Sequence, residues 1–123
     1  MKKFFCLADY GAAFATRAKG AEIADTMCDI IASLNDGDAL LIDFKRVEAL
    51  SYSFTDELFS RVLEASQREQ SIRKSIAVVG WSNELLTVLD QTLHRRECSL
   101  APSVSSQTKE TDERILEPFV SIT

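Results

Sequence analysis

A continuous apolar run near the middle of the chain sets the strongest limit on its fold. Residues 39–42 read Ala-Leu-Leu-Ile and are followed directly by Asp43 and Phe44. Four apolar residues without polar alternation are typical of a strand that is covered on both faces, as in parallel sheets. A short polar loop and an amphipathic pattern come next. Residues 38–63 therefore predict a strand, a loop and a helix, and we expect the functional residues there.

The helix after this strand has a marked start and one apolar face. Ser53 is expected to cap it by accepting a hydrogen bond from the backbone N–H of Asp56, whose carboxylate completes a variant of the capping box. Ser51, Ser53 and Thr55 are expected at the exposed mouth of the helix. Apolar residues recur at helical spacing and predict packing against the sheet. They are Phe54, Leu58, Phe59, Val62 and Leu63.

The segment before this unit predicts a strand and a long helix. Residues 2–8 are rich in apolar and aromatic side chains, which indicates a strand. Thr16 is a suitable N-cap for a helix over 17–34, which the sequence Asn35-Asp-Gly37 ends. Gly20 lies in the first turns of this helix, where glycine costs up to ~1 kcal/mol relative to alanine. It either permits the close approach of another backbone or is merely tolerated, and we prefer the second interpretation.

The segment after this unit predicts a further strand, a third helix and an edge strand. Residues 75–81 form a second buried apolar run, Ser82 is a suitable cap for the third helix, and residues 98–104 are expected at a sheet edge. This alternation predicts one α/β domain over 1–104 with a mostly parallel, four-stranded sheet. Residues 105–123 are expected to be a flexible polar segment with an apolar end. That end would fold back on the domain or join two copies in a homodimer.

Composition argues against several function classes. The 123 residues include 14 Lys and Arg against 19 Asp and Glu, and this formal net charge of −5 disfavours broad nucleic-acid binding. The basic helix end at 94–96 is expected to be a solvated surface. No apolar stretch approaches membrane-spanning length, and the one at the N-terminus is too short for a signal peptide. Cys6, Cys28 and Cys98 lack disulfide or zinc spacing. We therefore expect a reduced cytoplasmic protein without a membrane or nucleic-acid partner.

No complete catalytic motif is present. The chain has no glycine-rich phosphate loop, and a nucleophilic site would have to use the single histidine, His94. A divalent-metal or phospho-aspartate site of Asp43, Asp56 and Glu57 at the end of the strand is an alternative. However, Asp56 is explained as a cap partner, and Asp43 is expected to accept hydrogen bonds from loop amides. A protein without catalytic residues, metal or cofactor is expected.

A more specific pattern spans residues 41–58 and has two matching positions upstream. Its parts are, in chain order, Phe14, Arg17, the strand end Asp43-Phe44, Val47 and the helix start Ser53-Phe-Thr-Asp-Glu57. With these features the chain resembles the STAS domain of sulfate transporters and anti-anti-sigma factors. It resembles more closely a STAS-like group of small bacterial and phage proteins. The resemblance covers residues 14–90 and implies three helices packed mainly on one face of the sheet.

The resemblance also implies a function. In anti-anti-sigma members a partner kinase phosphorylates the serine at the start of this helix, which corresponds to Ser53. Those members have aspartate where this chain has Ser51, and a small residue where it has Phe54. The implied function is a non-enzymatic partner-switching module whose residues 45–61 bind a protein, such as a histidine-kinase-type ATPase that phosphorylates serine. The expected partner-binding residues are Arg46, Ser51, Tyr52, Thr55, Asp56 and Glu57.

An alternative function uses the same surface without a switch. The chain would then be a phage or mobile-element protein that binds or inhibits its partner constitutively. In that case Ser53 would be only a helix cap. Phosphorylation of Ser53 distinguishes the two.

Overall fold

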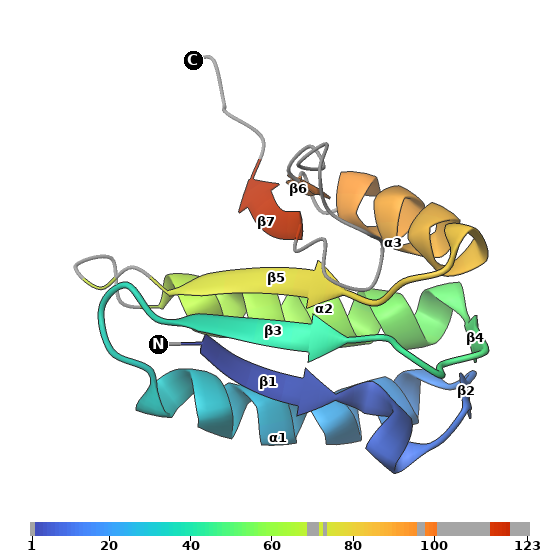
Figure 1. The fold of residues 1–123 in the computed structure, drawn as a ribbon, viewed down its shortest axis with the longest axis horizontal. Coiled ribbons are helices and arrows are strands. Elements are labelled where there is room, and N and C mark those ends of the chain that lie inside the picture. The colour runs from blue at the N-terminus through green and yellow to red at the C-terminus, as the bar shows by residue number, and fades with distance from the viewer. Residues whose placement is uncertain (1, 69–71, 73, 96–97, 101–113, 119–123) are drawn as a thin grey trace.

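The fold combines a five-stranded sheet, a small two-stranded sheet and three α-helices (Figure 1). The computed structural model describes residues 2–68, 72, 74–95, 98–100 and 114–118, to which these counts apply. In spatial order the main sheet contains β1 (Lys2–Cys6), β3 (Ala39–Asp43), β5 (Ser75–Val79), β7 (Arg114–Pro118) and β6 (Cys98–Leu100). The small sheet pairs β2 (Ala13–Phe14) with β4 (Ala49–Leu50). The helices are the 3₁₀ turn η1 (Leu7–Tyr10) and the α-helices α1 (Arg17–Ser33), α2 (Tyr52–Gln67) and α3 (Asn83–Arg95).

The main sheet joins three parallel strands to two antiparallel ones. Ile42 in β3 lies opposite Phe5 in β1 and Val78 in β5, both in parallel register. β7 pairs antiparallel with β5 and with β6. The predicted α/β class, with three helices and parallel strands, is confirmed, but the prediction of a four-stranded sheet is wrong. The missed strand is β7, which pairs with both β5 and β6 and so lies between the third expected strand and the expected edge strand.

The ends of two sequence predictions lie outside the described residues. The expected edge strand over 98–104 is seen as β6, and residues 101–104 are not described. The expected flexible segment over 105–123 includes β7, and its remaining residues, 105–113 and 119–123, are not described.

One apolar core lies between the sheet and the helices. Alternate residues of β1, β3 and β5 face it, as the two-residue period of a strand requires. These strand residues are Phe5, Leu40, Ile42, Ile76 and Val78. The helices add Ile23, Met27 and Ile31 from α1, Phe54, Leu58, Phe59 and Val62 from α2, and Leu85, Leu89 and Leu93 from α3. Each of the three helices thus buries its apolar face in the same cluster. None of the helices in the described ranges is long and apolar enough to cross a membrane.

α1 and α2 lie side by side, and their closest approach is at Gly20 (Figure 1). A Cβ atom at Gly20 would lie 2.6 Å from the backbone oxygen of Phe54 and 3.2 Å from the Cβ atom of Glu57. Side chains other than hydrogen do not fit at such distances. The interpretation that Gly20 is merely tolerated is therefore wrong, because it permits the contact of α1 with the first turns of α2.

The small sheet holds the starts of α1 and α2 together. β2 and β4 immediately precede these helices and pair in parallel, with Phe14 opposite Leu50. The backbone N–H of Ser51 donates to the carbonyl oxygen of Phe14 at 2.9 Å. The rings of Phe14 and Phe54 pack with their centroids 4.8 Å apart. Both helices consequently begin at the same end of the molecule, where the parallel strands also end.

Candidate functional site

The cap of α2 is Ser51. Its backbone is extended, with φ −87° and ψ 160°, and its Oγ accepts a hydrogen bond from the N–H of Phe54 at 3.1 Å. The same hydroxyl donates to the carbonyl oxygen of Ala15 at 2.8 Å. The prediction that Ser53 is the cap is wrong, because the bonds to β2 already hold Ser51 in the capping conformation. Ser53 lies one residue inside the helix, where its side chain is exposed and takes no part in the cap.

Arg17 links the starts of the two helices through ion pairs. Its Nη1 atom lies 3.0 Å from Oδ2 of Asp56 and 3.6 Å from Oε2 of Glu57. The side chains of Asp56 and Glu57 are only 23% and 21% exposed. These two predicted partner-binding carboxylates are therefore engaged within the domain, and a partner would meet them together with Arg17.

Of the other predicted contact residues in α2, one is buried and one is on the surface. Thr55 is 0% exposed, and its Oγ1 donates to the carbonyl oxygen of Ser51 at 2.8 Å. The prediction that Thr55 binds a partner is wrong, because this position of the first turn faces the core. Tyr52 is 43% exposed, and the guanidinium of Arg95 lies 5.9 Å from the centroid of its ring.

The loop between β3 and β4 contains a strained residue. Asp43 Oδ1 accepts a hydrogen bond from the N–H of Lys45 at 2.8 Å, and the N–H of Val47 donates to the oxygen of Phe44 at 3.0 Å. This tight turn gives Arg46 a φ of 69°, in the left-handed region. A non-glycine residue held there costs ~1–3 kcal/mol. The side chain of Arg46 is exposed, so its own burial does not offset the strain.

Replacing Arg46 by glycine is expected to raise the free energy of unfolding by about 1 kcal/mol, because glycine adopts positive φ without steric cost. Urea denaturation followed by circular dichroism measures the change. Lys45→Gly is the matched control, since Lys45 is an exposed neighbour whose φ is not positive. It should lower the stability. An Arg46→Gly variant no more stable than the wild type would show that this turn is unstrained.

A pocket of about 330 Å³ opens at the start of α2. Its walls come from the three helices and consist of Arg17, Tyr52, Ser53, Asp56, Thr92 and Arg95. Thr92 and Arg95 were not among the predicted site residues. Arg95 belongs to the basic helix end at 94–96, which was expected from the sequence to be only a solvated surface. This basic cluster was the one sequence signal that could have pointed to α3 as a wall of the pocket. The fold instead brings this end of α3 against the first turn of α2.

Comparison with known protein families gives one similarity. Residues 27–86 match the model of a family described as a STAS-like domain of unknown function (DUF4325). These residues, slightly less than half of the chain, are therefore similar to a STAS-like domain. The resemblance predicted from residues 41–58 is thereby confirmed, and the match runs from within α1 to the start of α3. Comparisons with curated proteins and with solved structures gave no significant match.

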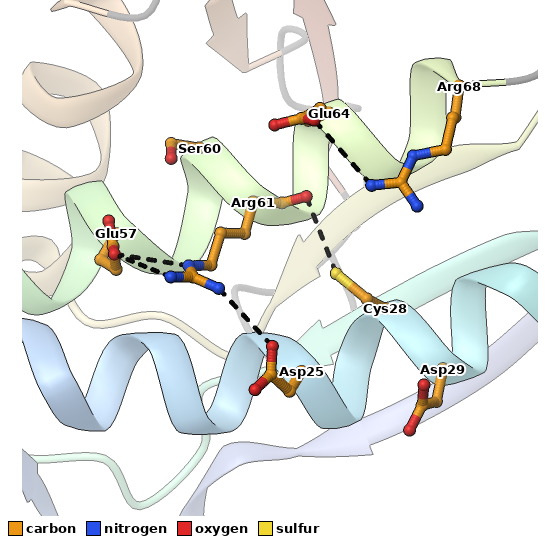
Figure 2. Close-up of a pocket in the computed structure, with 8 residues that line it drawn as sticks. All are labelled: Asp25, Cys28, Asp29, Glu57, Ser60, Arg61, Glu64 and Arg68. Carbon is orange, nitrogen blue, oxygen red and sulfur yellow. Dashed lines mark hydrogen bonds and ion pairs between the residues drawn. The ribbon is translucent and has the colours of Figure 1, made fainter.

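The protein has a second, larger groove between α1 and α2 (Figure 2). It is lined by Asp25, Cys28, Asp29, Glu57, Ser60, Arg61, Glu64 and Arg68. Arg61 spans it, with its guanidinium 3.6 Å from Asp25 Oδ1 and 3.3 Å from Glu57 Oε1. The charges in this groove are therefore largely paired with one another.

Cys28, at the floor of this groove, does not have the properties of a nucleophile. Its Sγ donates to the backbone oxygen of Arg61 at 3.7 Å. Burial raises the pKa of the Cys28 thiol, the carboxylates of Asp25 and Asp29 add to the rise, and the guanidinium of Arg68 opposes it. The thiol is therefore protonated at neutral pH, whereas a nucleophilic cysteine needs a lowered pKa.

The acidic residues at the end of β3 and in α2 do not converge. Asp43 bonds its own loop, while Asp56 and Glu57 pair with Arg17. In the described part of the chain, no three His, Cys, Asp or Glu side chains are grouped so that they could hold a metal ion.

Proposed function

We propose that this STAS-like domain is a non-enzymatic interaction module that binds a protein partner through residues 45–61 and is switched by phosphorylation of Ser53. The observation that carries the proposal is that the Ser53 side chain is exposed in the first turn of α2. It is not needed as the helix cap, because Ser51 has that role. A kinase can modify such a hydroxyl without breaking the cap. The proposed partner is a histidine-kinase-type ATPase that phosphorylates serine, as in the anti-anti-sigma proteins that the sequence resembles.

The surroundings of Ser53 suit a phosphate group. A phosphoserine carries a charge of about −1.5 to −2, which is favoured at the positive end of a helix. Arg17 and Arg95 line the same pocket as Ser53 and supply guanidinium donors. A phosphate on Ser53 would compete with Asp56 for Arg17 and would reverse the charge that the site presents. The domain would stay folded while its surface changed, which is the behaviour that a binding switch requires.

The surface beside Ser53 has the composition of an interface. Tyr52 is exposed, and tyrosine and arginine are enriched among the residues that dominate binding energies. Arg46 is also exposed and keeps a strained backbone that glycine would relieve. A strained residue with an exposed side chain supports a functional role for that side chain.

Gel filtration and calorimetry with an ATPase encoded beside this chain would test the proposal. Wild type and Ser53→Ala are expected to form a complex, whereas Ser53→Asp should bind at least about tenfold more weakly, because its charge faces the partner. Thr26→Asp is the matched control, since it adds the same charge at an exposed position of α1 outside residues 45–61. It should bind like the wild type.

Two results would count against this function. Absence of any complex with the wild type would remove the ATPase as the partner. A Ser53→Asp variant that bound as tightly as the wild type would remove the switch and leave a constitutive binding surface.

A further inference from the structure

The pocket at the start of α2 contains a buried hydroxyl without a partner. Thr92 lines it from α3 and is 1% exposed. In the described residues, its Oγ1 is the one buried side-chain oxygen or nitrogen that makes no hydrogen bond. Threonines inside helices commonly donate to the carbonyl four residues earlier. Thr55 and Thr87 both do so, to Ser51 and Asn83, but Thr92 does not. An unpaired buried hydroxyl is unfavourable, and because Thr92 is a wall residue of this pocket, a ligand bound there is the partner that we infer for it.

The other residues of the pocket wall supply the donors that an oxyanion requires. The first N–H groups of an α-helix have no acceptor within the helix. In α2 the N–H of Phe54 is bound to Ser51 Oγ, which leaves the N–H groups of Tyr52 and Ser53, two residues that line the pocket. The guanidinium groups of Arg17 and Arg95 add charged donors from two other helices.

Asp56 is the one carboxylate in the pocket wall, and it opposes an anion. Its charge is balanced by Arg17, at 3.0 Å. A guanidinium has five N–H donors, so Arg17 is able to bond Asp56 and a second oxyanion at once. With two arginines and one aspartate, the pocket wall carries one net positive charge in a chain whose formal net charge is −5.

We propose that this pocket binds the phosphoryl group of a small phosphomonoester. The tetrahedral group offers several acceptor oxygens to donors on residues that line the pocket from three helices: Arg17, Arg95, the N–H groups of Tyr52 and Ser53, and the Thr92 hydroxyl. The volume of about 330 Å³ is sufficient for a phosphate with a small organic substituent. This site does not depend on a protein partner. A phosphoryl group attached to Ser53 would use the same donors. Titration with free ligands distinguishes a free phosphomonoester from a phosphoryl group on Ser53.

NMR titration of the full chain with inorganic phosphate and with O-phosphoserine, at constant ionic strength, tests this site. Saturable shifts are expected for the amides of Tyr52 and Ser53 and for the methyl group of Thr92. Serine without phosphate is the ligand control and should cause none. Ser53→Ala should keep the affinity, because a free ligand uses the backbone N–H of residue 53 and not its hydroxyl.

Two variants should weaken phosphate binding about tenfold each, by loss of one charge-assisted or buried hydrogen bond. Thr92→Val keeps the shape of the side chain and removes only the unpaired hydroxyl, so the fold is retained. Arg95→Gln removes a charged donor. Arg68→Gln is the control, because Arg68 is an exposed arginine of the other groove, and it should bind phosphate like the wild type.

Three results would overturn the proposal. One is the absence of saturation at millimolar phosphate and phosphoserine, which would leave a phosphoryl group attached to Ser53 as the only source. Another is equal affinity of Thr92→Val and the wild type, which would show that the hydroxyl has no ligand. The third is loss of binding in Ser53→Ala, which would show that the free ligand needs the Ser53 hydroxyl and not the backbone donors.

Discussion

Replacing Gly20 by alanine is expected to destabilise the domain by about 2–3 kcal/mol, the usual range for forcing extra atoms into a packed interior. The added Cβ would lie 2.6 Å from the backbone oxygen of Phe54, so α1 and α2 would have to separate. The better helix propensity of alanine returns at most ~1 kcal/mol of this loss. Urea denaturation followed by circular dichroism would measure the difference in the free energy of unfolding.

Gly37→Ala is the control for this substitution. Gly37 has a positive φ of 85°, but no heavy atom lies within 4 Å of the position where its Cβ would be. It should therefore cost only the backbone strain, about 1 kcal/mol. If Gly20→Ala lowered the free energy of unfolding no more than Gly37→Ala does, the two helices would not be in contact at Gly20.

Ser51→Ala is expected to destabilise the domain by about 2 kcal/mol, the upper end of the range for an N-cap. The reason is that one hydroxyl makes two bonds, from the N–H of Phe54 and to the oxygen of Ala15. Ser53→Ala should change the stability by less than about 0.5 kcal/mol, as for other surface positions. Both variants can be compared in one set of thermal and urea unfolding curves.

The opposite order would be a serious contradiction. If Ser53→Ala were the more destabilising variant, Ser53 would be the cap and its side chain would not be available as described. The main support for a phosphorylation switch would then be lost. This matched pair of serines thus tests the structural basis of the proposed function without any knowledge of the partner.

Local signals in the sequence were enough for most of the fold. Thr16 does cap α1, where its side chain accepts from the N–H of Lys19 at 3.1 Å, and the helix ends at Ser33, close to the predicted end. The apolar runs at 39–42 and 75–81 do form neighbouring parallel strands. These features depend on capping and hydrophobic pattern, which residues close in sequence decide.

The missed features all depend on contacts between distant residues. β2 and β4 are two residues long each and have no pattern of their own, and they exist because 13–14 pairs with 49–50. β7 is recognised only through its pairing with β5 and β6. The role of Gly20 depends on the oxygen of Phe54, which is 34 positions away in the chain.

The candidate site shows the same division. The sequence predicted a site within residues 45–61, which stays a prediction, and Tyr52 and Ser53 in that segment do lie on the surface. Ser51 and Ser53 are both suitable caps for α2 by residue type, and the local capping-box pattern favours Ser53. Ser51 is the cap because its hydrogen bonds to Phe14 and Ala15 hold it in place. Thr92 joins the pocket only because α3 packs against α2, which no local pattern in its helix indicates.

Phosphosite mapping and intact-mass measurement of the protein from the cells that produce it naturally would test the central claim most directly. The proposed switch predicts a population that carries one phosphate, located on Ser53, and a fraction that changes with growth conditions. Ser53 unmodified under all conditions, or phosphate found only on other residues, would contradict it.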